Sequence, residues 1–121
     1  MLIGELARRT EVSPRLLRYY EEQGLLEPRR GAKGYRYYSD DAPARVRRIR
    51  ELLTTGLSTD DIRGLLPCTY DADRWVVPCD ESLVIVEGRL AALDTRITEL
   101  RRQRTLLGRQ RDALSAWLAA P

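Results

Sequence analysis

Hydrophobic residues recur at helical spacing in four short stretches and one long stretch of the 121-residue sequence. The first short stretch, residues 3–12, ends at Ser13 and Pro14, which are typical of a new helix start. Serine can accept a hydrogen bond from a free backbone amide, and proline at the first helical position has no amide donor to lose. The pattern therefore predicts two short helices in close succession, as in a helix-turn-helix.

The second predicted helix runs from Pro14 to Gln23–Gly24, where glycine can adopt the left-handed conformation that ends a helix. Leucine and tyrosine form its expected apolar side: Leu16, Leu17 and Tyr20. A cationic and aromatic set is then left facing outward: Arg15, Arg18 and Tyr19. We expect Tyr20 to lie in the core rather than on a binding surface.

Residues 27–38 change from helical to extended spacing. Two glycines enclose a flexible tip that carries Lys33, and residues 35–38 are rich in strand formers. This pattern predicts a small hairpin with a basic tip, which beside a helix-turn-helix is a wing. The alternation leaves open whether Tyr37 faces inward or outward.

Two further helices are predicted before residue 67. One begins near Asp40–Asp41 and continues to Gly56, with Pro43 in its first turn, where proline is tolerated. Four arginines decorate it, and Arg47 and Arg48 face either DNA phosphates or solvent. The other helix begins after Ser58, because Ser58–Asp61 matches a capping box with aspartate at its last position.

The longest pattern begins at Asp80 and continues almost to the end of the sequence. Its hydrophobic residues recur in steps of three and four once Arg104 and Arg111 fill two vacant positions, which is typical of a coiled coil. We call this stripe the seam: Leu83, Val86, Leu90, Leu93, Ile97, Leu100, Leu107, Leu114 and Leu118. The first 66 residues are too few to cover a helix of about 55–60 Å, so we expect a second copy of the chain to cover it. The two arginines favour a seam that is continuous only in its first half, or helices that cross antiparallel.

Charge is unevenly distributed, although the net charge is only +3. Residues 28–50 contain eight Lys or Arg and two Asp, whereas residues 67–121 contain eight residues of each sign. Five of the six tyrosines lie between Ser13 and Tyr38, interleaved with arginines. Cations neutralise phosphates, and tyrosine packs against sugars and base edges, so this segment fits DNA binding. The basic charge alone fits an ordinary solvated surface equally well.

Other classes of function fit less well. The sequence has no histidine, and its acidic residues form no catalytic motif, so we expect no enzymatic activity. A purely structural coiled-coil protein would explain residues 80–118 but not Arg18–Tyr19 or the wing. The sequence shows neither a signal peptide nor an apolar run of about 20 residues, so we expect a cytoplasmic protein.

Five motifs together resemble those of the MerR family of bacterial transcription regulators. They read IGELA from Ile3, VSPRLLRYYE from Val12, GLL from Gly24, GYRYYS from Gly34 and LSTDDI from Leu57. Their order, spacing and residue types agree with the family over about the first 66 residues.

The sequence departs from the family at two places. Glu11 stands where the family often has glycine, and Asp41–Pro43 replaces the more usual acidic and apolar start of the third helix.

The resemblance implies a mainly α fold in which a winged helix-turn-helix precedes a long antiparallel coiled-coil helix. Residues 1–66 would form the DNA-binding domain with its linking helices, residues 67–80 a cysteine-containing linker, and residues 81–121 the dimerisation helix. Seam residues 83–107 would carry the homodimer contacts.

The resemblance also implies how DNA is bound. The second helix would enter the major groove, and the wing would lie against the flanking backbone. We expect the contacts from these residues: Ser13, Arg15, Arg18, Tyr19, Arg30, Lys33, Tyr35, Arg36 and Tyr38. Family members bend and untwist a promoter whose spacer is too long, so that RNA polymerase can engage it. Dimer symmetry predicts an inverted-repeat site.

The sequence does not identify the signal to which the regulator responds. The helix that ends the sequence leaves no separate ligand-binding domain to expect, so attention falls on Cys68 and Cys79. They are interpreted as small buried residues, as a thiol or redox sensor, or as ligands of a metal ion. Metal-sensing members carry a further cysteine beyond the long helix, which this sequence lacks. A small ligand near Trp75 is a further alternative, and no cofactor is assigned.

Overall fold

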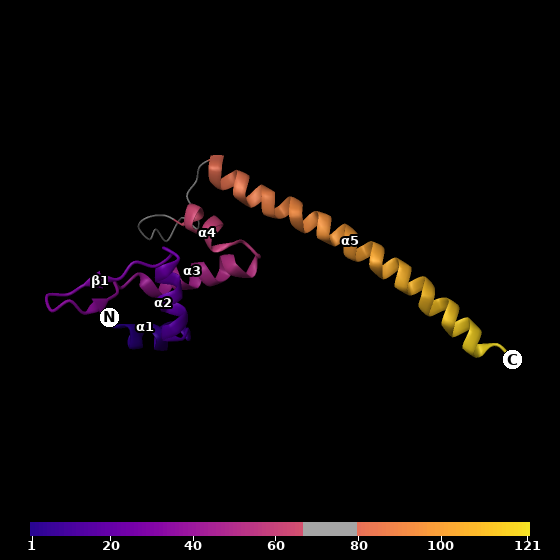
Figure 1. Cartoon of the computed structure of the whole chain (residues 1–121), viewed down its shortest axis with the longest axis horizontal. Helices are drawn as coiled ribbons and strands as arrows, with labels where there is room; N and C mark the ends of the chain where they lie inside the picture. The colour runs from indigo at the N-terminus through magenta and orange to yellow at the C-terminus, as the bar shows by residue number, and fades with distance from the viewer. Residues whose placement is uncertain (67–79) are drawn as a thin grey trace. The chain divides into compact units, whose positions relative to one another are not determined.

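The computed structural model describes residues 1–66 and 80–121, and it is mainly α-helical. The chain divides into two compact units, Met1–Ile85 and Val86–Pro121. The first unit contains α1 (Ile3–Thr10), α2 (Pro14–Glu22), β1 (Arg29–Arg30), β2 (Arg36–Tyr37), α3 (Ala42–Thr54) and α4 (Thr59–Leu65). Figure 1 shows its four helices gathered together, with the hairpin projecting from them. The predictions for Cys68, Cys79 and Trp75 lie outside the described residues.

The helix-turn-helix is confirmed, and its start signals act as expected. The Ser13 side-chain oxygen accepts a hydrogen bond from the Leu16 amide at 3.2 Å, and Pro14 is the first helical residue of α2. Glu11 ends α1 with a φ of 58°, in the left-handed region that usually favours glycine. The turn therefore keeps the geometry that glycine would give, at a cost of about 1 kcal/mol for the side chain.

The buried face of α2 differs from the prediction at one position. Leu17 and Tyr20 are buried as expected, but Leu16 is 37% exposed. Residues three apart share a helix face, whereas adjacent residues are rotated by about 100°. Leu16, adjacent to Leu17 and four residues before Tyr20, therefore lies at the edge of the buried face, and its assignment to the apolar side was wrong.

One hydrophobic core joins the helices of the first unit. In it α1 packs against α2 and α3, and α3 packs against α4. The core consists of residues from every helix up to α4 and from the turns between them: Leu6, Val12, Leu17, Tyr20, Leu25, Leu26, Tyr38, Ala42, Val46, Ile49, Leu52, Leu57, Ile62, Leu65 and Leu66. Each buried leucine contributes about 1.5–3 kcal/mol, so this core is the main source of stability for the helix-turn-helix.

The predicted starts of α3 and α4 are also confirmed. α3 begins at Ala42 directly after Asp41, with Pro43 in its first turn. The Ser58 side-chain oxygen accepts from the Asp61 amide at 3.1 Å and so caps α4. The Ser58 cap satisfies an amide group that the start of α4 leaves without an internal partner.

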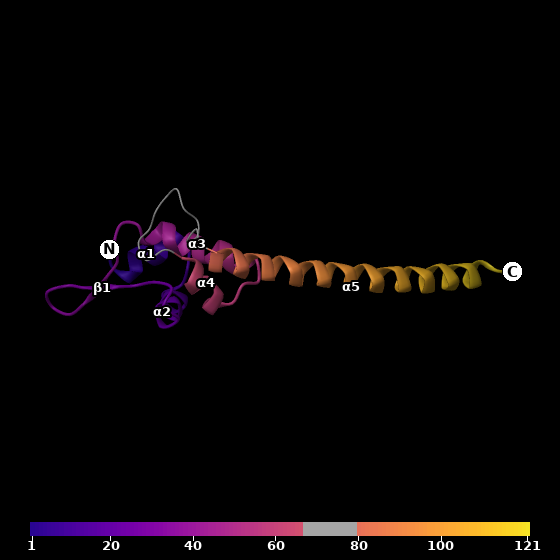
Figure 2. The ribbon, with the colours of Figure 1, turned by 90° about the horizontal axis from the view of Figure 1, so that it is seen from above.

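The long helix α5 (Asp80–Ala119) is continuous over 40 residues. Figure 2 shows it as a single unbroken helix, and the rise of about 1.5 Å per residue gives a length of about 60 Å. Ile85, at the end of the first unit, packs against the core of that unit. In residues 1–66 and 80–121, no helix is long and apolar enough to cross a membrane.

Candidate nucleic-acid interface

The outward face of α2 carries the cationic and aromatic side chains that the sequence predicted. Arg15 and Arg18 are exposed, and the Tyr19 side chain is 43% exposed. The buried residues Leu17 and Tyr20 fix the opposite face of the helix in the core. Because the core sets the rotation of α2, the face that bears the arginines is presented to solvent on a rigid support.

The wing is a two-stranded antiparallel hairpin in which Arg29 pairs with Tyr37 and Arg30 pairs with Arg36. Its tip is closed by a hydrogen bond from the Gly34 amide to the Gly31 carbonyl at 2.9 Å. Arg30, Lys33 and Arg36 are exposed along this hairpin. The wing therefore presents a row of cations, as the sequence predicted.

Two tyrosines shape one side of the wing. Tyr35 is 53% exposed, and its ring lies 6.3 Å from the ring of Tyr37, centroid to centroid. A β-carbon on Gly31 would stand 2.5 Å from the Tyr35 ring, so only glycine leaves room for this ring position. Tyr37 is half-buried, which places it between the two alternatives that its alternation left open.

Tyr38 departs from the predicted contact surface. Its side chain is only 1% exposed, and its hydroxyl donates a hydrogen bond to Glu21. A side chain that is buried and bonded in this way cannot lie against a DNA backbone, so we remove Tyr38 from the expected contacts. Tyr38 follows directly after β2, and two backbone hydrogen bonds with Met1 hold it where its side chain joins the core.

Glu21 is a functional candidate that the sequence reasoning missed. Its side chain is only 9% exposed, and one carboxylate oxygen accepts a hydrogen bond from Arg36 at 3.0 Å. Burial and the bond to Glu21 raise the pKa of the Tyr38 hydroxyl, whereas the charges of Arg36 and Arg18 lower it. Glu21 thus lies among two arginines and a tyrosine that the sequence assigned to DNA contact.

Two arginines from later helices hold the chain that follows α2. Arg63 of α4 donates to the Gln23 carbonyl at 2.6 Å, and Arg45 of α3 donates to the Leu25 carbonyl at 2.7 Å. Gln23 is the C-cap of α2, and Leu25 lies in the turn that follows it. These side chains therefore position α2, whereas Arg47 on the outer face of α3 is exposed.

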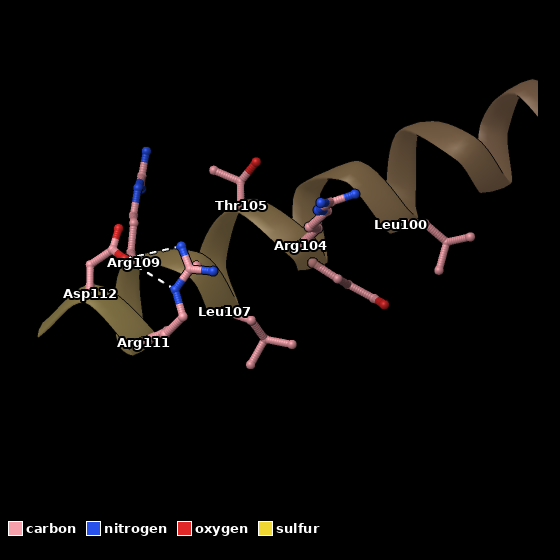
Figure 3. A pocket seen from close by; sticks show the side chains of 9 residues that line it. Leu100, Arg104, Thr105, Leu107, Arg109, Arg111 and Asp112 are labelled. Carbon is pink, nitrogen blue, oxygen red and sulfur yellow. Dashed lines mark hydrogen bonds and ion pairs between the residues drawn. The ribbon is translucent and has the colours of Figure 1, made fainter. Parts of the chain in front are cut away.

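Most seam residues along α5 are exposed, for example Leu90 at 55% and Leu107 at 70%, whereas Leu93 is half-buried. Figure 3 shows Leu100 and Leu107 projecting to the same side of the helix, while Arg111 forms an ion pair with Asp112 at 3.1 Å. In the described part of the chain, no group of three or more metal-binding side chains is present.

An exposed basic recognition helix beside a basic wing defines the class of the protein, a DNA-binding protein of the winged helix-turn-helix type. Two family models match the sequence: the MerR HTH family regulatory protein over residues 1–68, and the MerR DNA-binding family over residues 44–110. The chain belongs to the MerR family of transcription regulators.

Similar proteins come from several bacteria. The HTH-type transcriptional regulator ZntR of Escherichia coli is 38% identical over 112 residues, which are 92% of this chain and 78% of that protein. The HTH-type transcriptional regulator HmrR of Rhizobium leguminosarum is 33% identical over 107 residues, covering 88% of this chain and 81% of that protein.

Solved structures agree with the fold. The transcription regulator PbrR691 from Ralstonia metallidurans, solved in complex with lead(II), has a TM-score of 0.71 and 33% identity, covering 92% of this chain and 86% of that chain. HiNmlR, a MerR family regulator lacking the sensor domain and bound to promoter DNA, has a TM-score of 0.58 and 27% identity, covering 90% and 85%.

Proposed function

We propose that this regulator binds an inverted-repeat promoter site as a homodimer and reshapes an overlong spacer for RNA polymerase. The observation that carries the proposal is the exposed face of α2, with Arg15, Arg18 and Tyr19 beside the basic wing. In this proposal, residues 1–66 bind DNA, residues 67–80 connect the two domains, and residues 81–121 form the dimer. The promoter complex of HiNmlR supports the DNA-bound state.

The DNA contacts divide by chemistry. Arg15, Arg18 and Tyr19 are proposed to read base edges and backbone in the major groove, because they share the outer face of a helix that fits there. The wing carries three exposed cations, Arg30, Lys33 and Arg36. We propose that they neutralise the phosphates that flank the major-groove contacts. Phosphate contacts set the position and the salt dependence of binding, whereas base contacts set the sequence preference.

The homodimer is supported by the uncovered seam and by the charges beside it. In the heptad pattern, Glu87, Asp94 and Arg101 occupy the same flanking position in successive heptads. Residues 80–99 contain five acids and two arginines, whereas residues 100–121 contain five arginines and one acid. Two antiparallel helices would place the acidic half of each against the basic half of the other, which favours that direction.

Binding is tested with fluorescence anisotropy on the DNA upstream of the gene. Arg18→Ala should weaken specific binding by about 1–3 kcal/mol and relax the sequence preference. Arg109→Ala removes the same charge from an exposed position on α5 and serves as the matched control. Equal losses in both variants, or unchanged sequence preference in Arg18→Ala, would contradict the role of α2.

Spacer remodelling is tested by transcription in vitro. The native promoter is compared with one whose spacer is shortened to the ordinary length. We expect the protein to activate only the overlong promoter, because shortening the spacer removes the need for untwisting. Equal activation of both promoters would contradict the remodelling mechanism.

We further propose that the signal acts through Cys68 and Cys79, by thiol oxidation or by binding a soft metal ion. Two similar proteins support the metal alternative. PbrR691 was solved with lead(II), and the heavy metal-dependent transcription regulator 2 of Rhizobium meliloti is 33% identical over 83% of this chain and 67% of its own length. Thiolates suit soft metals, and they are also the species that oxidants attack.

The signal is identified by transcription assays on reduced, mildly oxidised and zinc- or lead-loaded protein. A response to metal that disappears in Cys68→Ser/Cys79→Ser would assign metal sensing, and a response to oxidation that disappears would assign redox sensing. Identical behaviour of all samples would show that the cysteines are structural and would direct the search to a small ligand near Trp75.

A further inference from the structure

The carboxylate of Glu21 joins the recognition helix to the wing. Glu21 lies near the end of α2, yet its side chain is only 9% exposed. One carboxylate oxygen accepts from the hydroxyl of Tyr38, and the other accepts from Arg36 at 3.0 Å. Both partners lie at the second strand of the wing, 15 and 17 residues further along the chain.

The wing needs such an anchor because its own ladder is short. Each strand has two residues, and isolated hairpins of this kind are marginally stable in water. At its base, the backbone of Tyr38 also exchanges two hydrogen bonds with Met1, at 2.6 and 2.7 Å. The hydroxyl bond to Glu21 ties the same residue to α2. Tyr38 is therefore held by its backbone to the N-terminal segment and by its side chain to the recognition helix.

Resting on the proposed DNA-binding function, we propose that Glu21 is a positioning residue for DNA recognition. It fixes the wing and the guanidinium of Arg36 relative to Arg18. Arg18 lies three residues before Glu21 on α2, and its charge acts on the nearby Tyr38 hydroxyl. The spacing between groove contacts and backbone contacts is then set before DNA arrives. Binding loses less conformational freedom when the contacting groups are already placed.

This role makes a prediction opposite to that of simple electrostatics. An acidic side chain near DNA repels phosphates, so removing its charge should tighten binding if repulsion were its only effect. If Glu21 instead positions Arg36 and the wing, removing its charge should weaken binding. The weakening should also depend on Arg36 being present, because Glu21 acts through that guanidinium.

The test is a double-mutant cycle on full-length protein, with affinity for the promoter site measured at fixed salt. We expect Glu21→Gln to weaken binding about fivefold, and to change it less than about twofold when Arg36→Ala is already present. Glu22→Gln is the matched control, because Glu22 is the exposed neighbouring acid on α2. Hydroxyl-radical footprints should lose protection at the flanks and keep it at the centre of each half-site.

Tighter binding by Glu21→Gln, or equal weakening in both backgrounds, would overturn the proposal. Circular dichroism checks that each variant is folded at the assay temperature. Should Glu21→Gln be unfolded, Tyr38→Phe replaces it, since this change keeps the charge and removes one anchor. It should weaken binding about two- to fivefold with the same loss at the flanks, and unchanged binding would overturn the proposal. If the parent protein shows no sequence-specific binding, the proposed function itself fails.

Discussion

The hydroxyl of Tyr38 is held in a site that keeps it neutral. The residue is buried, and its oxygen donates to a carboxylate, so an ionised phenolate would be both poorly solvated and repelled. Burial also raises the pKa of Tyr20, against the opposing effect of Arg50. Both tyrosines therefore favour the folded state only while they remain protonated.

We expect stability to fall at alkaline pH because of these tyrosines. Their folded-state pKa values lie above the unfolded value of about 10, so their contribution is complete below about pH 10 and is lost as pH rises further. Tyr38→Phe should cost about 1–2 kcal/mol at neutral pH by removing a buried hydrogen bond, and should flatten the alkaline decline. Urea unfolding between pH 7 and pH 11 measures both effects, and an unchanged alkaline slope would contradict them.

Local residue signals predicted some positions well and others poorly. The capping roles of Ser13 and Ser58 were predicted correctly, because a cap acts within one helical turn. The assignment of Leu16 was wrong because the helical pattern does not show where the buried face ends, and Leu16 lies at its edge. The partnership of Glu21 with Tyr38 was missed because it joins residues 17 positions apart, and no local pattern reports such a contact.

Among the elements, α5 differs most from its sequence pattern, because the pattern predicts a covered apolar seam and the seam is largely exposed in a single chain. Its seam is apolar except at Arg104 and Arg111, and it is exposed along the second unit. Arg111 forms an ion pair with Asp112. An arginine in a seam costs stability because its charge is partly removed from water.

We expect Arg104→Leu to tighten the homodimer, because a leucine there would continue the apolar seam between Leu100 and Leu107. The gain should be about tenfold in dissociation constant, equal to roughly 1.4 kcal/mol. Sedimentation equilibrium measures it, with Arg102→Leu on the outer face as the control. A weaker dimer in Arg104→Leu would contradict the assigned seam.

The helices were predicted more securely than the small elements around them. Periodic hydrophobic spacing over many residues predicted α5, and its start at Asp80 lies at the expected acidic residues. The wing was predicted from its glycines and tyrosines, but each strand has only two residues and their pairing register had no sequence signal. That a second copy of the chain covers α5 stays a prediction, because the seam pattern indicates an apolar surface and does not identify its partner.

At the scale of the whole molecule, under the proposed homodimer, the direction in which two copies pair would decide how the DNA-binding units are spaced. The antiparallel arrangement would bring Arg101 of one helix towards Glu87 or Asp94 of its partner. A parallel arrangement would instead bring Arg101 near Arg96, since these positions flank the seam on opposite sides.

Arg101→Glu distinguishes the two directions. It should weaken an antiparallel dimer roughly fivefold, because two attractive pairs become repulsive, and should strengthen a parallel one. Arg102→Glu introduces the same charge change on the outer face and should leave the dimer unchanged. Sedimentation at low and high salt measures both variants, since added salt should reduce the difference between them.

The exposed seam of α5 also bears on how much of this regulator a cell must maintain. A single helix with many exposed leucines is unfavourable in water. Under the proposed pairing, the ordered form of α5 therefore depends on protein concentration, because two chains must associate to cover the seam. Dilution by growth would then reduce promoter occupancy more steeply than the fall in copy number, because occupancy requires two chains. The separated chains would also be the form most open to proteases, which would shorten the lifetime of any surplus unpaired protein.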